Sequence, residues 1–304
     1  MKQFIVILVI VLIALGVFGW TQGWFNSDLT TEPDTEQDGE NDENSTGTTT
    51  DKEDGVGLDE DGGVIGSSAG DRDIMAYQYG DGSTELLFVG GVHGGYSANT
   101  ALVAFEVMDW LEENPNVIPE NVKVTVIPVL NPDGLNEVVG TTGRFSVSDI
   151  PSGDRSAGRF NANNVDLNRN FDCNWQSTGT WQSQEVDAGD SVFSEPESQA
   201  LRDYIRSNEP DAAVVFFSAA GEVVASSCNN DSLPETQQMV STYANASGYT
   251  AQETFGYYDI TGDAVDWMAK QGIPAISVVL GSHNSAEWSK NRAGIEALFE
   301  RYEN

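Results

Sequence analysis

The stretch ELLFVGGVHGGYSANT, residues 85–100, decides how we interpret the fold of this chain. It begins with an apolar run that is typical of a buried strand, and the following NTALVAFEVMDWLEEN, residues 99–114, has apolar side chains at a helical period. Asn99 is the predicted N-cap of that helix. His93, one of only two histidines, therefore lies where a strand gives way to a helix, which is where sites form in parallel α/β sheets.

The alternation of strand and helix patterns continues along the chain. The next strand pattern ends in the predicted turn NPDG, residues 131–134, and the helix that opens at Ser194 has Glu197 at the spacing of a capping box. Further strand patterns cover residues 122–130, 211–221 and 273–281, and further helix patterns cover residues 194–208, 261–271 and 286–304. This order predicts one α/β domain, residues 64–304, with a central, largely parallel sheet.

The N-terminal region has two different compositions. Residues 4–18, FIVILVIVLIALGVF, are unbroken apolar sequence behind Lys2, which predicts a membrane anchor within residues 1–25. A cleaved signal peptide, giving a secreted protein, is the alternative. Residues 26–63 are rich in acids, Thr and Gly, and are predicted to form a disordered linker. The folded domain would then lie outside the cytoplasm, held at the membrane by its N-terminal segment.

The charge of the chain restricts its possible partners, and its cysteine content predicts a disulfide. The chain has 48 Asp and Glu against 14 Lys and Arg, a formal net charge of -34, which argues against nucleic acid or an anionic membrane surface as the partner of the folded domain. Cys173 and Cys228 are the only cysteines, and export predicts that they form one disulfide. Two free buried thiols are the alternative.

Five motifs together resemble the zinc carboxypeptidase A family of metallopeptidases. They are GGVHGGYSANT at 90–100, NPDG at 131–134, NANNVDLNRNF at 161–171, FSEPESQAL at 193–201 and TGDAVDWMAKQGIPAISVVLG at 261–281. The resemblance implies an α/β fold with a mixed sheet of about eight strands and one zinc ion, which is held by two histidines and a glutamate and leaves a position open for water. It also implies removal of C-terminal residues from peptides, or trimming of cell-wall peptides, with a separate glutamate as general base.

The same resemblance shows that most of the zinc chemistry is missing from this sequence. His93 matches the first histidine ligand, but the glutamate ligand position is Tyr96 or Ser97, and the second histidine position is Phe217. The general base position is Val279, so no catalytic residue is intact. We therefore expect no cofactor, with zinc bound weakly or not at all. His283 is expected to have a structural or surface role, and nothing in the spacing requires Asp133 or Glu222 as replacement ligands.

The residues that hold the substrate in the family are retained here. By resemblance, Asn168 and Arg169 match the clamp for the C-terminal carboxylate, and Arg159 matches the arginine that polarises the scissile carbonyl. Tyr258 matches the mobile tyrosine that caps the pocket, and Asp166 matches the carboxylate that orients the first histidine ligand. At the side-chain specificity position, Val265 hints at tolerance for an apolar residue.

These observations favour an exported carboxypeptidase-like domain that binds the C-terminus of a peptide or cell-wall stem peptide without hydrolysing it. One alternative is a working metallocarboxypeptidase with an unconventional metal site. The other is a structural or adhesive exported domain whose pocket is vestigial. The three hypotheses differ in what they require of zinc and of Arg169.

Overall fold

The central element of the fold is an eight-stranded mixed sheet with the strand order β1-β2-β4-β3-β7-β10-β8-β9. The computed structural model describes residues 58–229 and 232–303. The predicted anchor, residues 1–25, and all but the end of the predicted linker lie outside them. The strands are β1 Gly63–Ser67, β2 Asp73–Tyr79, β3 Thr84–Val89, β4 Val122–Ile127, β7 Ala212–Ser218, β8 Glu222–Ala225, β9 Thr250–Gln252 and β10 Ala275–Leu280.

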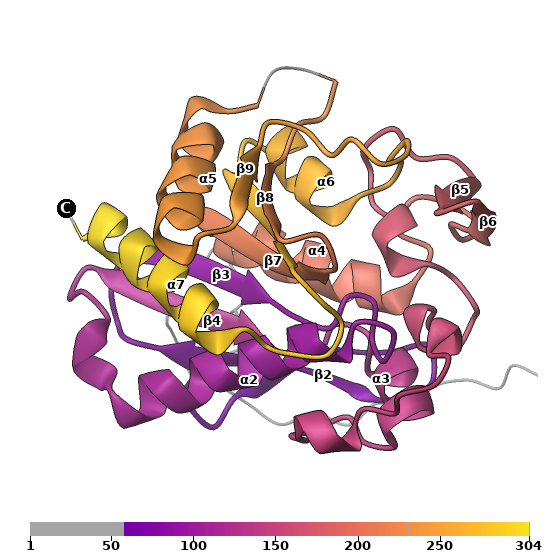
Figure 1. Cartoon of the computed structure of the whole chain (residues 1–304), viewed down its shortest axis with the longest axis horizontal. Coiled ribbons are helices and arrows are strands. Elements are labelled where there is room, and N and C mark those ends of the chain that lie inside the picture. The colour runs from indigo at the N-terminus through magenta and orange to yellow at the C-terminus, as the bar shows by residue number, and fades with distance from the viewer. Residues whose placement is uncertain (1–57, 230–231, 304) are drawn as a thin grey trace, which may run out of the picture. The chain divides into compact units, whose positions relative to one another are not determined.

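Strand direction confirms the predicted sheet. The pairs β3/β4, β3/β7, β7/β10 and β8/β9 run parallel, whereas β1/β2, β2/β4 and β8/β10 run antiparallel. Parallel central strands are covered on both faces, which explains why β3 and β7 are almost wholly apolar and buried. Their carboxyl ends, together with that of β10, meet at one edge of the sheet (Figure 1).

Helices cover both faces of this sheet (Figure 1). The helices α2 Ala98–Glu113, α5 Pro234–Ser247 and α7 Trp288–Tyr302 pack on one face, where the core includes Trp110, Tyr243 and Phe299. On the other face lie α4 Pro196–Asn208 and α6 Ala264–Lys270, with Tyr204 and Trp267 in the core. The remaining elements are α3 Pro132–Val139, the hairpin of β5 Thr178–Trp181 and β6 Gln184–Asp187, and the 3-10 turns Pro115–Val117, Val147–Asp149, Ser156–Arg159 and Leu167–Arg169.

Three local predictions were wrong. NPDG begins helix α3 instead of forming a free turn, with the Asn131 side chain accepting a hydrogen bond from the Gly134 N–H at 2.8 Å. Asn99 lies inside α2, whose N-cap is Ser97, because the Asn99 amide is bonded to a distant loop. The expected capping box fails because Glu197 accepts from the backbone N–H of Ala69 instead of turning back to its own helix.

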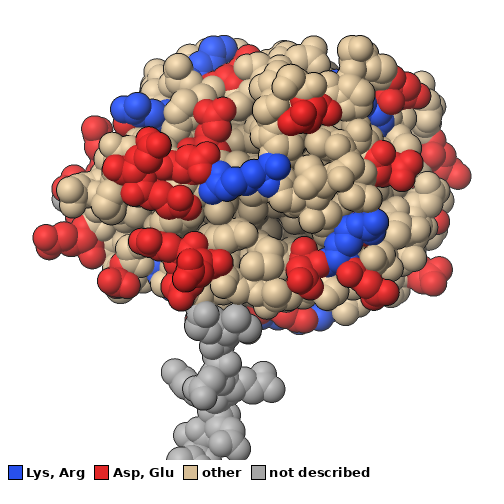
Figure 2. Space-filling model, turned by 90° about the horizontal axis from the view of Figure 1, so that it is seen from below, with Lys and Arg blue, Asp and Glu red and all other residues tan. Residues whose placement is uncertain are grey.

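The predicted disulfide between Cys173 and Cys228 is confirmed, with a Cα–Cα separation of 5.8 Å. Disulfides persist in oxidising compartments, so this pairing favours a domain that folds outside the cytoplasm. Within the described residues, no helix combines the length and the apolar character needed to cross a membrane. Acidic side chains are spread over the face shown in Figure 2, with a few basic ones among them, as the composition of the chain leads one to expect.

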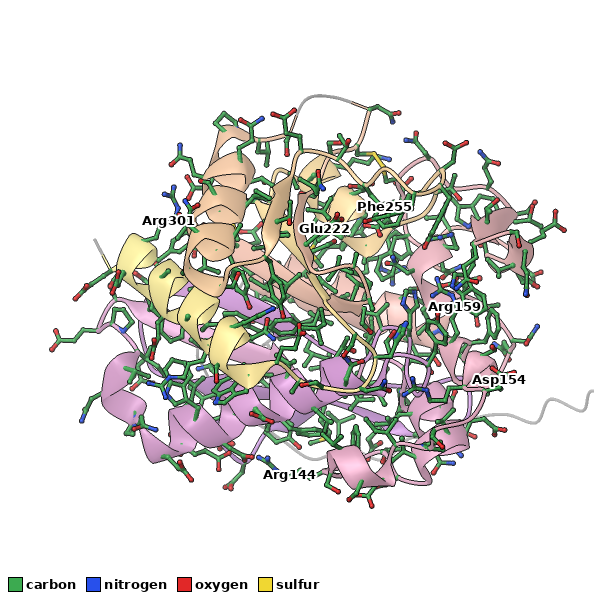
Figure 3. All side chains as sticks on the ribbon, viewed as in Figure 1. Arg144, Asp154, Arg159, Glu222, Phe255 and Arg301 are labelled. Atoms are coloured by element: carbon green, nitrogen blue, oxygen red, sulfur yellow. A yellow bond between two sulfur atoms is a disulfide. The ribbon has the colours of Figure 1, made fainter. Side chains whose placement is uncertain are left out.

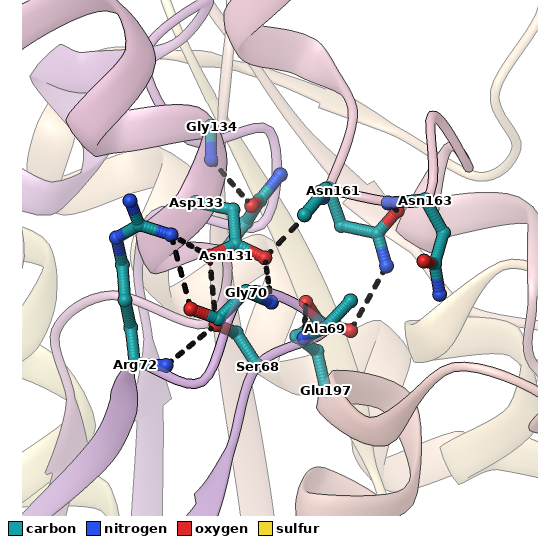
Figure 4. A network of polar contacts seen from close by, with 11 residues as sticks. Ser68, Ala69, Gly70, Arg72, Asn131, Asp133, Gly134, Asn161, Asn163 and Glu197 are labelled. Carbon is teal, nitrogen blue, oxygen red and sulfur yellow. Dashed lines mark hydrogen bonds and ion pairs between the residues drawn. The ribbon is translucent and has the colours of Figure 1, made fainter.

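A buried polar network joins the turn after β1 to helix α3 (Figure 4). The carboxylate of Asp133 accepts hydrogen bonds from Ser68 Oγ at 2.7 Å, the Gly70 N–H at 2.9 Å and Arg72 Nη1 at 2.7 Å. Beside it, the fully buried carboxylate of Glu197 accepts from the Ala69 N–H and Asn161 Nδ2, both at 3.0 Å. Glu197 forms no ion pair with any described residue, although its neighbour Asp133 does. Its charge is therefore compensated only by hydrogen bonds.

The buried Glu197 makes stability depend on pH in a defined window. Burial raises its pKa to about 7, so its contribution to stability is complete below its ordinary pKa near 4.5 and is lost as the pH rises toward 7. This loss corresponds to about 3 kcal/mol. In Glu197→Gln, the difference in unfolding free energy from wild type should change by this amount between pH 4.5 and 7 in denaturant titrations. The exposed Glu113→Gln is the control, and parallel pH profiles for wild type and Glu197→Gln would contradict the assignment.

Candidate functional site

A cavity of about 380 Å³ opens at the carboxyl ends of β3, β7 and β10. His93 follows β3, Phe217 and Ser218 end β7, and Val279 lies in β10, so the three strands deliver these side chains to one place. Arg159 comes from the 3-10 turn before the β5–β6 hairpin, and Phe255 comes from the loop between β9 and α6; both are labelled in Figure 3. The structure thus brings together His93, Tyr96, Arg159, Asn168, Arg169, Phe217, Tyr258, Val279 and His283.

A buried ionic group forms one wall of the cavity. Arg159 Nε donates to Asp166 Oδ2 at 2.8 Å, and Arg159 Nη2 lies 2.8 Å from the same oxygen. Asp166 is fully buried and Arg159 is 2% exposed. Burial alone would raise the pKa of Asp166, but the Arg159 charge and the His93 ring outweigh it and hold that pKa well below the usual range. This aspartate is therefore ionised at neutral pH.

His93 lies beside this ionic group, with Nε2 3.5 Å from Asp166 Oδ1. The distance is too long for a strong hydrogen bond. Burial and the Arg159 charge lower the pKa of His93 to about 4, so its ring is neutral at pH 7. The predicted proximity of His93 and Asp166 is therefore present in the structure. The ring nitrogen Nε2 faces the carboxylate, which leaves Nδ1 as the nitrogen that another group could use.

Apolar side chains stand next to His93 where the family resemblance places a ligand and a base. The ring of Phe217 lies 5.5 Å from that of His93, centroid to centroid. Phe217 and Val279 are directly paired across the parallel strands β7 and β10. Both are less than 10% exposed and belong to one apolar cluster with Trp267. This part of the cavity wall is therefore hydrocarbon.

The two residues at the glutamate ligand position are committed elsewhere. The Tyr96 ring packs against Trp181 at 4.9 Å and against His283 at 4.8 Å. Ser97 is buried at the N-cap of α2. Asp133 and Glu222 do not line the cavity, because Asp133 is held by Arg72 and Glu222 accepts from Gln252 at 3.0 Å. None of these four residues places a carboxylate in the described cavity lining.

Asn168 and Arg169 line the same cavity. Arg169 is 1% exposed, with Nη1 donating to the Asn168 carbonyl at 2.7 Å and Nη2 to the Thr180 carbonyl at 2.9 Å. Its Nε is buried without a hydrogen-bond acceptor among the described residues. Gly179 covers the side chain so closely that a Cβ there would come within 2.5 Å of Arg169 Cδ. The Tyr258 ring lies 5.6 Å from the guanidinium carbon, where the predicted cap should be.

Three further side chains position this site, and sequence reasoning missed their contacts. Trp181 stacks under Arg159 at 4.6 Å, and nothing in the irregular sequence around it signals that contact. Asp263 caps α6 and accepts from Asn168 Nδ2 at 2.6 Å; an Asp directly before an apolar helical run is a signal that could have found the cap. Asn99 donates to the Ser282 and Ser285 carbonyls and accepts from Ser218 Oγ.

The Asn99 contacts explain the position of His283. Ser218 Oγ lies 2.9 Å from His283 Nδ1, so the loop after β10 is fastened to the end of β7 through Ser218 and Asn99. Burial, with the charges of Arg155 and Arg159, lowers the pKa of His283. A neutral ring in a chain of hydrogen bonds is what a structural role requires. That role remains a prediction.

The fold and the cavity at the carboxyl ends of the strands define a carboxypeptidase-like protein. The family described as zinc carboxypeptidase matches residues 63–300, and the chain belongs to that family. It is 26% identical over 246 residues to gamma-D-glutamyl-L-diamino acid endopeptidase 1 of Lysinibacillus sphaericus, an alignment that covers 73% of this chain and 60% of that relative. The chain thus spans less than two thirds of the length of this relative.

Solved structures support the same fold. Bovine thrombin-activatable fibrinolysis inhibitor superposes with a TM-score of 0.63 at 19% identity, covering 80% of this chain and 88% of that one. Murein-tripeptide amidase MpaA from Escherichia coli O157 gives a TM-score of 0.57 at 21% identity, covering 79% and 91%. At 19% and 21% identity, this similarity shows a shared fold and no more.

The residues present do not fit the zinc ion that the family name implies. A zinc site of this kind needs three nitrogen or oxygen ligands around an open position. Here the His93 ring lies beside the Phe217 ring, and the Asp166 carboxylate near it is bonded to Arg159. The other imidazole of the cavity, His283, has Nδ1 2.9 Å from Ser218 Oγ. Among residues 58–229 and 232–303, no three His, Cys, Asp or Glu side chains come together in a way that could hold a metal ion.

Proposed function

We propose that this chain is a carboxypeptidase-like binding protein that holds the C-terminus of a peptide and does not hydrolyse it by the zinc mechanism of its family. The observation that carries the proposal is the contrast between the two parts of one cavity. The part around Arg169 and Arg159 keeps two buried guanidinium groups, and Arg169 Nε has no hydrogen-bond acceptor among the described residues. The part around Phe217 and Val279 is apolar and lacks the groups that would activate water.

A carboxylate is the ligand that such a wall suits. Arg guanidinium groups present planar, fixed N–H donors that match carboxylate geometry, and desolvation strengthens the resulting bonds. The relative from Lysinibacillus sphaericus bears a name that refers to a gamma-D-glutamyl-L-diamino acid bond, and the Escherichia coli structure of similar fold is named as a murein-tripeptide amidase. Their names support a cell-wall stem peptide, as well as an ordinary peptide, as the source of that C-terminus. We further propose that the N-terminal segment tethers the domain at the outer face of a membrane.

Replacing Arg169 tests the binding proposal. Arg169→Ala should weaken binding of tripeptides with a free C-terminal carboxylate by about thirtyfold or more, because a buried charge-assisted hydrogen bond is lost. The same peptides with an amidated C-terminus should bind weakly to both proteins. Affinities would be measured by calorimetry on the full-length chain. Arg206→Ala, which removes an exposed arginine, is the matched control.

Arg169 also bonds two backbone carbonyls, so thermal unfolding must show that the variant is folded. Arg169→Lys provides a second test, because lysine keeps the charge but loses the planar fork. Equal affinity of wild type and both variants for the free acids would overturn the proposal. That result would favour a structural or adhesive domain with a vestigial pocket.

A further inference from the structure

His283 lines the same cavity as Arg169 but belongs to a different part of its wall. The His283 ring packs against the Tyr96 ring at 4.8 Å, and the Arg159 guanidinium carbon lies 5.8 Å from the centre of that same Tyr96 ring. The Arg169 guanidinium instead lies beside Tyr258. A peptide whose carboxylate is held at Arg169 would therefore pass Arg159 and Tyr96 before it reaches His283.

The hydrogen bonds around His283 determine which of its ring nitrogens carries a proton. Asn99 Nδ2 donates to the carbonyls of Ser282 and Ser285 at 2.7 and 3.0 Å, so Asn99 Oδ1 is left as an acceptor. The single hydroxyl proton of Ser218 goes to that oxygen, at 3.0 Å. Ser218 Oγ can then only accept from His283 Nδ1, which lies 2.9 Å away. We therefore assign the Nδ1–H tautomer to His283, with the lone pair on Nε2.

The direction of these hydrogen bonds decides what the His283 ring can do. A histidine that activates a serine must accept the hydroxyl proton, whereas here His283 Nδ1 donates to Ser218 Oγ. Ser218 and His283 are therefore not arranged as a nucleophile and its base. One ring nitrogen fastens the loop after β10, and the other is an acceptor with no such task.

His283 Nε2 is available to a ligand. It makes no hydrogen bond with any described residue, and it is not buried. Burial of the ring, with the charges of Arg155 and Arg159, lowers the pKa of His283, so Nε2 keeps its lone pair at pH 7. Neither arginine donates to it, because Arg155 bonds the His283 carbonyl and Asn284 Oδ1, and Arg159 bonds Asp166.

We propose that His283 Nε2 accepts a hydrogen bond from a peptide N–H of the bound ligand, on the N-terminal side of the residue whose carboxylate Arg169 holds. The inference rests on the proposed function, because the carboxylate at Arg169 sets the course of the preceding chain past Arg159. A neutral acceptor of this kind discriminates in one way. An ordinary peptide bond can donate to it, whereas a bond to proline, an N-methylated bond or an ester cannot.

A scan with ester-containing peptides tests this inference on the full-length chain by calorimetry. The parent is acetylated tetra-alanine with a free carboxylate, and in each analogue one N–H preceding the C-terminal residue is replaced by an ester oxygen. One of these esters should bind wild type about tenfold more weakly than the parent, on the order of the net contribution of one hydrogen bond.

His283→Asn shows whether the imidazole causes this difference. Asparagine can still donate to Ser218 from the position of Nδ1, but it has no acceptor at the position of Nε2. In this variant the parent and that ester should bind within about twofold of each other, because only the affinity for the parent falls. Asn284→Ala, which changes an exposed residue of the same loop, should keep the tenfold difference.

The outcomes separate the inference from the function on which it rests. Binding of every such ester by wild type within about twofold of the parent would overturn the inference and leave the carboxylate clamp standing, and this result needs no variant to fold. A tenfold difference that persists in His283→Asn would also overturn it. If the parent binds no more tightly than its C-terminal amide, the proposed function is wrong and the inference falls with it.

Discussion

Asp166→Ala should lower the free energy of unfolding by about 3 to 5 kcal/mol, the largest stability change that we expect from a single substitution in this site. The variant leaves the Arg159 guanidinium 2% exposed and without its carboxylate, and arginine cannot release its proton to escape the cost. Denaturant titration of wild type and variant at pH 7 measures the effect. Asp73→Ala, which removes an exposed acid, should change stability by less than about 0.5 kcal/mol.

A double variant tests whether the unpaired Arg159 charge causes this loss of stability. In Arg159→Met with Asp166→Ala the buried charge is removed with its partner, so much of the lost stability should return. A loss below about 1 kcal/mol for Asp166→Ala alone would mean that water or another group solvates Arg159, contrary to the geometry described above. Because the pKa of Asp166 is depressed in the folded state, the contribution of the pair is present above about pH 4 and is lost as the pH falls.

The second large effect that we expect is weak zinc binding together with very slow release of C-terminal residues. After incubation with zinc and exchange into zinc-free buffer, the full-length chain should retain far less than one zinc per chain, and His93→Ala should not change that content. Release of C-terminal residues should be at least a hundredfold to ten-thousandfold slower than by a working zinc carboxypeptidase in the same assay, on the order expected for the missing general base alone. Val279 and Phe217 supply neither a base nor a ligand.

Metal analysis and a peptide-release assay decide this prediction together. Stoichiometric zinc that depends on His93, accompanied by turnover, would contradict it and would favour a metallocarboxypeptidase with an unconventional metal site. Zinc without turnover would leave the binding proposal standing but would require ligands other than those described here.

The fold was the part of this molecule most accessible from sequence. Apolar runs such as the one before His93 predict buried parallel strands, because such strands are covered on both faces and carry no polar alternation. The resemblance of the motifs to the family also assigned His93, Phe217, Arg169 and Val279 to one site, and all four line one cavity. These features depend on short-range patterns, which a single sequence displays.

The features that were missed depend on contacts between distant residues. Asn99 was expected to cap its own helix, but it bonds carbonyls more than 180 positions away. Glu197 was expected to complete a capping box, but it accepts from the backbone of Ala69. In each case a tertiary hydrogen bond outweighs the local preference of the residue.

The pairing of Phe217 with Val279 bears on how this chain could change over generations. Phe217→His alone, or Val279→Glu alone, would place a polar side chain against an apolar neighbour. Burying a polar group without a hydrogen-bond partner lowers stability. Each single step toward a zinc enzyme would therefore yield a less stable protein with no activity gained. Mutation from this sequence toward hydrolysis would therefore pass through less stable intermediates.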